Sequence, residues 1–150
     1  MPIVFRPARA EELQRAEELV VRSINDLTER HGFGRMATLR PPEFQLFSLK
    51  DDVDGLWVAE AKGEIVGFAL SWVCGDLWFL AKLFVAPGHQ GRGVGNELLA
   101  RTFAHGRKAG ATCPYRKSDP HVLMVQSTKH RPHFDTPAAL NCPPIGGILA

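Results

Sequence analysis

The chain has 150 residues, which suits a single domain able to bury one core. Its 18 Lys and Arg residues against 16 Asp and Glu residues give a formal net charge of +2, too small to indicate nucleic acid as the main partner. The three cysteines have no metal-ligand spacing, the N-terminus has no signal-peptide pattern, and no apolar run approaches the length of a membrane span. These features predict a cytoplasmic protein with no metal site and no membrane span.

The first 52 residues predict a strand, a long helix and a loop. Residues 3–6 form the strand, and residues 10–30 form the helix, because apolar side chains recur there at steps of three and four: Leu13, Ala16, Val20, Ile24 and Leu27. Gly32 suits the exit from that helix. Residues 33–52 predict a loop with a short helix after Pro42, since proline fits the first turn of a helix.

Three strand-like runs follow in close succession, at residues 55–61, 64–73 and 76–86. The first two flank Lys62-Gly63, a plausible hairpin turn, and only two residues separate the second run from the third. Such short connections predict an antiparallel meander, which Pro87-Gly88 ends.

A second helix is predicted over residues 93–108, burying Val94, Leu98, Leu99 and Phe103. We therefore predict an α/β (α+β) fold: a mixed, mostly antiparallel sheet flanked by helices, with residues 1–150 forming one domain. Its core is expected to include Val20, Ile24, Val58, Val66, Phe68, Leu83, Val85, Leu98 and Leu99.

The last 40 residues differ in character, since they hold six of the 11 prolines. Residues 121–126 favour a strand, but the prolines interrupt any helical period in the remainder. We predict that residues 111–150 form an incomplete or irregular C-terminal part. His121, His130 and His133 match no metal-ligand pattern.

The stretch VAPGHQGRGVGNELL, residues 85–99, places glycines at 91, 93 and 95 directly before the second helix. Exposed amide N–H groups and the positive end of a helix dipole together bind anions, most often phosphate. Asn96-Glu97 stands where a P-loop needs Lys and Ser or Thr, and the glycine spacing differs from that of a dinucleotide fingerprint. The stretch does match Gln/Arg-x-x-Gly-x-Gly/Ala, through Gln90, Gly93 and Gly95. The alternative, an ordinary tight turn, needs one glycine at positive φ rather than three.

In this context the stretch LFVAPGHQGRGVGNELL, residues 83–99, resembles the GCN5-related N-acetyltransferases (GNAT), and the resemblance covers residues 3–110. It implies that acetyl-CoA is the co-substrate and that the fourth strand splays from the fifth to admit its pantetheine arm. By this resemblance, backbone groups of Leu83, Phe84 and Val85 bind the arm, and an N–H near Val85 is the oxyanion contact. The pyrophosphate is expected on the amides of Gln90, Gly91, Arg92, Gly93, Val94, Gly95 and Asn96, with a further charged contact from the side chain of Arg92.

The resemblance implies transfer of an acetyl group to a primary amine by direct attack on the thioester. The catalytic residues stay unassigned: Asp76 is the one carboxylate near the fourth strand and is more typical of a turn, and Tyr115, the only tyrosine, stands outside any predicted helix. The acceptor loop, residues 33–52, shows no charge preference, and a homodimer stays open. Two alternatives to an active enzyme remain, an inactive acyl-CoA-binding module and a regulatory domain that holds an anion.

Overall fold

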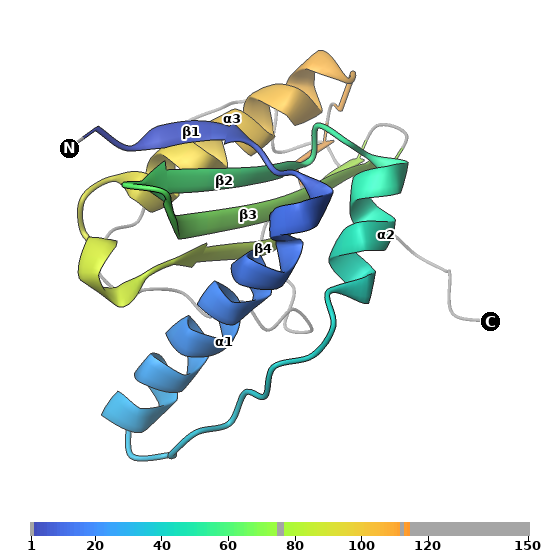
Figure 1. Ribbon diagram of the computed structural model, residues 1–150. Helices are drawn as coiled ribbons and strands as arrows, with labels where there is room; N and C mark the ends of the chain where they lie inside the picture. The colour runs from blue at the N-terminus through green and yellow to red at the C-terminus, as the bar shows by residue number, and fades with distance from the viewer. Residues whose placement is uncertain (1, 75–76, 112, 115–150) are drawn as a thin grey trace.

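The computed structural model describes residues 2–74, 77–111 and 113–114 (Figure 1). Five strands, three α-helices and two short 3₁₀ helices follow one another along this part of the chain. In chain order they are β1 (Val4–Pro7), η1 (Ala10–Glu12), α1 (Leu13–Arg30), α2 (Glu43–Asp51), β2 (Leu56–Ala61), β3 (Glu64–Cys74), β4 (Leu77–Val85), η2 (Pro87–His89), α3 (Val94–Lys108) and β5 (Cys113–Pro114).

The strands form one sheet in the order β1-β2-β3-β4-β5. The pairs β1–β2, β2–β3 and β3–β4 are antiparallel, which confirms the predicted meander and the mixed α+β class. The turn between β2 and β3 has positive φ at Lys62 (53°) and Gly63 (78°), as expected of a tight hairpin turn. β5 pairs with β4 in parallel through two residues only, and the sequence pattern did not indicate this strand. The predicted strand at 121–126 and the rest of the predicted irregular tail, at 112 and 115–150, lie outside the described residues.

Helix α1 packs on one face of the sheet and α3 on the other (Figure 1). The apolar stripe predicted for α1 is confirmed at Leu13, Ala16 and Val20, which are buried, whereas Ile24 packs at the rim of the core. Of the other predicted core residues, Val58, Val66, Phe68 and Leu98 are buried, and Leu83 and Val85 are partly buried against the core. None of the helices in the described part of the chain is long and apolar enough to cross a membrane.

The buried face of α3 differs from the prediction. Val94 and Leu98 are buried as expected, but the face continues through Thr102 and Gly106 instead of Leu99 and Phe103, which stay partly exposed. Steps of four residues keep these positions on one side of the helix. Thr102 tolerates burial because its hydroxyl lies 3.1 Å from the carbonyl oxygen of Leu98 and 3.0 Å from that of Leu99. A pattern read from hydrophobicity alone cannot recognise a threonine and a glycine as core positions.

Gly106 is buried because Trp78 of β4 lies directly against it. A Cβ atom at this position would lie 2.4 Å from Cδ1 of Trp78, far inside van der Waals contact. Phe103 packs on the same indole ring, edge to face, with 5.3 Å between ring centroids. The missing side chain therefore sets how closely α3 approaches β4.

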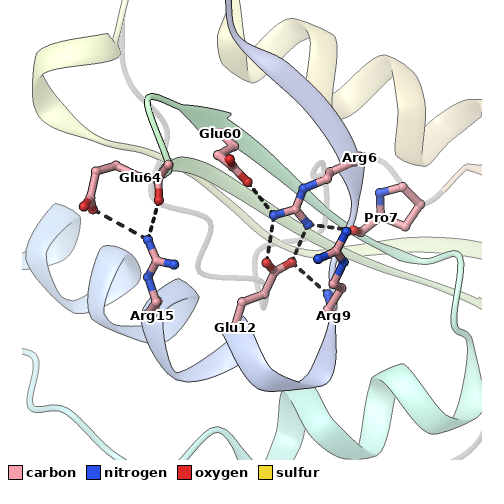
Figure 2. A network of polar contacts seen from close by, with 8 residues as sticks. Arg6, Pro7, Arg9, Glu12, Arg15, Glu60 and Glu64 are labelled. Carbon is pink, nitrogen blue, oxygen red and sulfur yellow. Dashed lines mark hydrogen bonds and ion pairs between the residues drawn. The ribbon is translucent and has the colours of Figure 1, made fainter.

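A partly buried ionic network joins β1 to η1 and β2 (Figure 2). The guanidinium of Arg6 donates to both oxygens of Glu12, at 2.7 and 2.9 Å, and to Glu60 at 2.5 Å. The backbone N–H of Arg9 also donates to Glu12, at 2.8 Å. Burial alone would raise the pKa of Glu12, but these donors outweigh it, so the pKa of this carboxyl is lowered.

We predict that Gly106→Ala destabilises the protein by about 1–3 kcal/mol, as overpacked cores typically do. The expected sign is informative because alanine is ordinarily favoured over glycine in a helix by about 1 kcal/mol. Urea unfolding of the parent and variant measures the difference, with Ala104→Gly on the exposed side of α3 as the control for helix propensity. A variant as stable as the parent would show that Trp78 does not set the spacing of α3.

We predict that Glu12→Gln lowers the free energy of unfolding at pH 7 by about 1–3 kcal/mol, the range for hydrogen bonds to charged groups. Because the folded pKa of Glu12 is lowered, its contribution is present above its unfolded pKa of about 4.3 and is lost as pH falls through the folded value. The difference between parent and variant should therefore shrink in acid. Glu64→Gln is the matched control, since its pair with Arg15 at 3.8 Å is exposed. A difference that stays constant down to pH 2 would contradict this account.

Candidate functional site

Part of the outer edge of β4 pairs with no strand among the described residues. The N–H of Ala86 donates to the carbonyl of Val66 at 2.8 Å, which fixes the hydrogen-bonded register of the β3–β4 pair. Because that register alternates in antiparallel strands, Phe84 faces β3, and Leu83 and Val85 direct their N–H and C=O groups away from it. Within the described residues β5 pairs only with Leu77 and Trp78, so no described strand lies beside Leu83–Val85. Of the three residues predicted to bind the pantetheine arm, Phe84 therefore has its backbone groups bonded to β3, and only Leu83 and Val85 direct theirs outward.

A bulge in β4 precedes this open edge. Leu70 pairs with Lys82 and Ser71 pairs with Leu80, so Ala81 is an extra residue on β4. Bulges twist a strand and are common next to active sites.

The carbonyl of Val85 is already occupied. It accepts a hydrogen bond from the side-chain amide of Gln90 at 3.0 Å, and the hydroxyl of Ser23 in α1 lies 3.5 Å from it. Ser23 is buried and also donates to the carbonyl of Leu19, at 2.8 Å. The N–H of Val85 is therefore the group of this residue that remains available at the edge.

The glycine loop leads from this edge into α3. Gly91 (φ 76°) and Gly93 (φ 80°) take the left-handed conformation that favours glycine, and Gly93 is the residue that precedes the first turn of α3. Gly95 differs from the expectation of three equivalent glycines: it lies within the helix, where an added Cβ would touch Val85 at 3.5 Å. That distance is an ordinary van der Waals contact, so the fold of the described residues does not itself require glycine at this position.

The first turn of α3 has uncapped amide groups. The first bond inside the helix runs from the N–H of Glu97 to the carbonyl of Gly93, at 3.0 Å, so the amides of Val94, Gly95 and Asn96 have no partner four residues earlier. No side chain caps the helix at Gly93. Gln90 and Arg92 are exposed in the preceding loop, and Arg92 lies two residues from the helix start. Three free amides, the helix dipole and an arginine form an arrangement suited to an anion.

Side chains of β4, α1 and α2 form a polar cluster that the sequence did not indicate. The ammonium of Lys82 lies 2.9 Å from Oε2 of Glu17 in α1, and the side-chain amide of Gln45 in α2 donates to the same oxygen. Lys82 and Glu17 are mostly buried, with side chains 23% and 15% exposed. Three elements thus bring their polar side chains together beside the bulge of β4.

The loop between α1 and α2 is held to α1 by one buried amide. The side-chain oxygen of Asn25 accepts hydrogen bonds from the N–H groups of Met36 and Ala37, at 2.9 and 2.8 Å, and its nitrogen donates to the carbonyl of Ala37 at 2.9 Å. Within the loop and α2, Phe33, Met36, Phe44 and Phe47 are exposed. The predicted short helix after Pro42 is confirmed as α2.

Two of the residues weighed for catalysis, Asp76 and Tyr115, lie outside the described residues. Asp52 does not face β4's open edge: its carboxylate bonds to His105 at 2.8 Å and to the N–H of Val73 at 3.1 Å. Among the residues that the structure describes, no group of three or more His, Cys, Asp or Glu side chains could hold a metal ion.

The chain matches a known protein family over the part that contains this candidate site. A model of the acetyltransferase (GNAT) family matches residues 17–116, which include most of α1, strands β2 to β4, the glycine loop and α3.

Solved structures share this fold at low sequence identity. The PaiA N-acetyltransferase of Thermoplasma acidophilum, crystallised with coenzyme A, is 18% identical, with a TM-score of 0.59 over 74% of this chain and 76% of that one. The diaminobutyrate acetyltransferase EctA of Paenibacillus lautus, crystallised with L-2,4-diaminobutyric acid and coenzyme A, is 22% identical, with a TM-score of 0.55 over 74% of this chain and 62% of that one. A protein of Pyrococcus horikoshii is 21% identical, with a TM-score of 0.57 over 71% of this chain, which spans only 35% of that longer chain.

Proposed function

Because the chain belongs to the acetyltransferase (GNAT) family, we propose that it transfers an acetyl group from acetyl-CoA to a primary amine of an acceptor. The observation that carries this proposal is the continuity between an open strand edge at Leu83–Val85 and the uncapped first turn of α3. A strand edge suits the amide-containing pantetheine arm, and a helix N-terminus suits the pyrophosphate. Several structures of the same fold contain coenzyme A or acetyl-CoA.

The residues fit this co-substrate in three places. Leu83 and Val85 offer outward backbone groups to the pantetheine arm, as an added strand would need. The amides of Val94, Gly95 and Asn96, with those of Gln90, Gly91, Arg92 and Gly93 in the loop, surround the expected pyrophosphate position. Arg92 adds a charge-assisted contact to a phosphate oxygen.

The reaction asks three things of the protein: a neutral amine, a polarised carbonyl and a proton for the departing thiolate. We assign polarisation of the thioester carbonyl to the N–H of Val85. The carbonyl oxygen of Val85 accepts a hydrogen bond from Gln90, which supports this role for the N–H. Removing one such donor from an oxyanion site typically costs about 10²–10³-fold in rate.

The proposal also covers the compartment, the oligomeric state and the partners of the chain. We expect residues 1–150 to act as one cytoplasmic domain, as a monomer or a homodimer, with an amine-bearing acceptor and without nucleic acid. The alternatives are an inactive acyl-CoA-binding module and an anion-binding regulatory domain. Release of free thiol from acetyl-CoA with a panel of amines separates the enzyme from both, and CoA binding without turnover separates the two alternatives from each other.

We predict that CoA at about a hundred times its dissociation constant stabilises the folded chain by roughly 2.7 kcal/mol, measured as a rise in melting temperature. Gly93→Val should weaken CoA binding tenfold or more, about 1.4 kcal/mol, because a β-branched side chain at φ 80° is strained and crowds the expected phosphate position. Gly88→Val is the matched control, since Gly88 is exposed in the same loop with open space around its Cα.

Gly93→Asn separates strain from crowding, because asparagine tolerates the left-handed conformation better than valine does. If folded Gly93→Val and Gly93→Asn both keep the full CoA shift, the loop is not a pyrophosphate site. If the parent chain shows no shift with CoA, the acetyltransferase proposal fails for this chain.

We predict a smaller, salt-dependent effect for Arg92→Ala. An exposed ion pair is worth about 0.2–1 kcal/mol, which is less than the loss expected for Gly93→Val, and it weakens as ionic strength rises. Calorimetric titration with CoA at low and high salt measures it. An equal loss of affinity at both salt concentrations would argue against a direct ionic contact.

A further inference from the structure

The chemistry proposed above lacks one group: β4 itself carries no carboxylate between Leu77 and Val85. A cationic acceptor amine must lose a proton before it attacks, and a carboxylate near the reacting atoms is the simplest proton acceptor. The structure brings a carboxylate to β4 from α1 instead, since Glu17 contacts Lys82, the residue immediately before Leu83.

Helix α1 runs beside β4 over the whole proposed reaction segment. Glu17 lies at Lys82, and Ser23, six residues later, lies at Val85. Six helical residues rise about 9 Å, and three strand residues span about 10 Å. The spacing of the two contacts along α1 therefore matches their spacing along β4. Glu17 lies at one end of this segment and Ser23 at the other.

The carboxylate of Glu17 can accept more hydrogen bonds than the described residues donate to it. Oε2 accepts from both Lys82 and Gln45, whereas none of the described residues donates to Oε1. An ionised carboxylate can accept about four hydrogen bonds. With 15% of its side chain exposed, Glu17 is reachable from outside, and its present partner is a primary ammonium group.

From this geometry we infer that Glu17 is the proton acceptor for the acceptor amine, with Lys82 and Gln45 as positioning residues that hold its carboxylate at the bulge of β4. This inference rests on the proposed acetyltransferase function. It names the acceptor's reactive group as a primary ammonium that binds beside Lys82.

The step balances as follows. The substrate ammonium gives one proton to Oε1 of Glu17, and the neutral nitrogen attacks the thioester carbon of acetyl-CoA. The C–N bond forms, the C–S bond breaks, and the second proton from nitrogen passes to the thiolate sulfur. Glu17 then releases its proton to water. The products are the acetamide, CoA thiol and one proton.

The test uses two small probes with the full chain and acetyl-CoA. Methylamine is protonated at neutral pH and must lose a proton before attack, whereas hydroxylamine is mostly neutral already. Glu17→Gln keeps the size and the hydrogen-bonding oxygen of the side chain but not its basicity. It should lower kcat for methylamine by about 100-fold or more, lower kcat for hydroxylamine only a few-fold, and leave the CoA melting shift unchanged. Rates are corrected for the reaction of each probe without protein.

Two further variants sharpen the result. Glu64→Gln removes an exposed carboxylate whose ion-pair partner is Arg15 rather than Lys82, and it should change neither rate. Lys82→Met removes the cation that shares Glu17, so it should lower the KM for methylamine and leave the KM for hydroxylamine unchanged. A lost structural contact would not distinguish the two probes.

Each outcome decides the matter. Equal loss with both probes in Glu17→Gln, or no loss with either, overturns the role of Glu17. A parent chain that binds CoA but acetylates neither probe also overturns it, while leaving CoA binding intact. A parent chain that does not bind CoA overturns the proposed function itself, together with this inference.

Discussion

The alternation of hydrogen bonds along β4 is the constraint on which the candidate site depends. An antiparallel strand commits every second residue to its neighbour, so Phe84 serves β3 and leaves Leu83 and Val85 facing outward. The bulge at Ala81 falls just before this segment, so the direction of the side chains changes there. The glycine loop then turns the chain so that the free amides of α3 follow the free groups of the strand. Within the described residues, outward N–H groups therefore occur at Leu83 and Val85 and again in the first turn of α3, at Val94, Gly95 and Asn96.

Helix α1 brings polar side chains next to this part of β4. Its apolar side packs into the core through Leu13, Ala16 and Val20, while Glu17 and Ser23 reach the two ends of the open segment. The neighbouring residue Asn25 fixes the loop that leads to α2, and α2 in turn supplies Gln45 to Glu17. The same helix therefore packs into the core, holds the loop between α1 and α2, and places the carboxylate of Glu17 beside Lys82 of β4.

Local patterns in the sequence predicted most of the fold. Periodic apolar residues predicted α1, and turn residues predicted the meander. The glycine loop does take positive φ, at Gly91 and Gly93. The sequence could not indicate contacts between distant residues of ordinary type. Glu17 and Lys82 are 65 positions apart, and Arg6 and Glu60 are 54 apart. Gly106 was missed for the same reason, since its role exists only once Trp78 lies against it.

Strand β1, at the opposite border of the sheet, has features that disfavour pairing with a strand of another molecule. Unpaired strands invite pairing between molecules, and short length, proline and charge are the usual protections. β1 has four residues, ends at Pro7 and carries Arg6, whose charge is held by Glu12 and Glu60. This border is a poor template for aggregation. Among the described strands, the backbone groups that pair with no neighbour therefore lie mainly on the β4 side of the sheet.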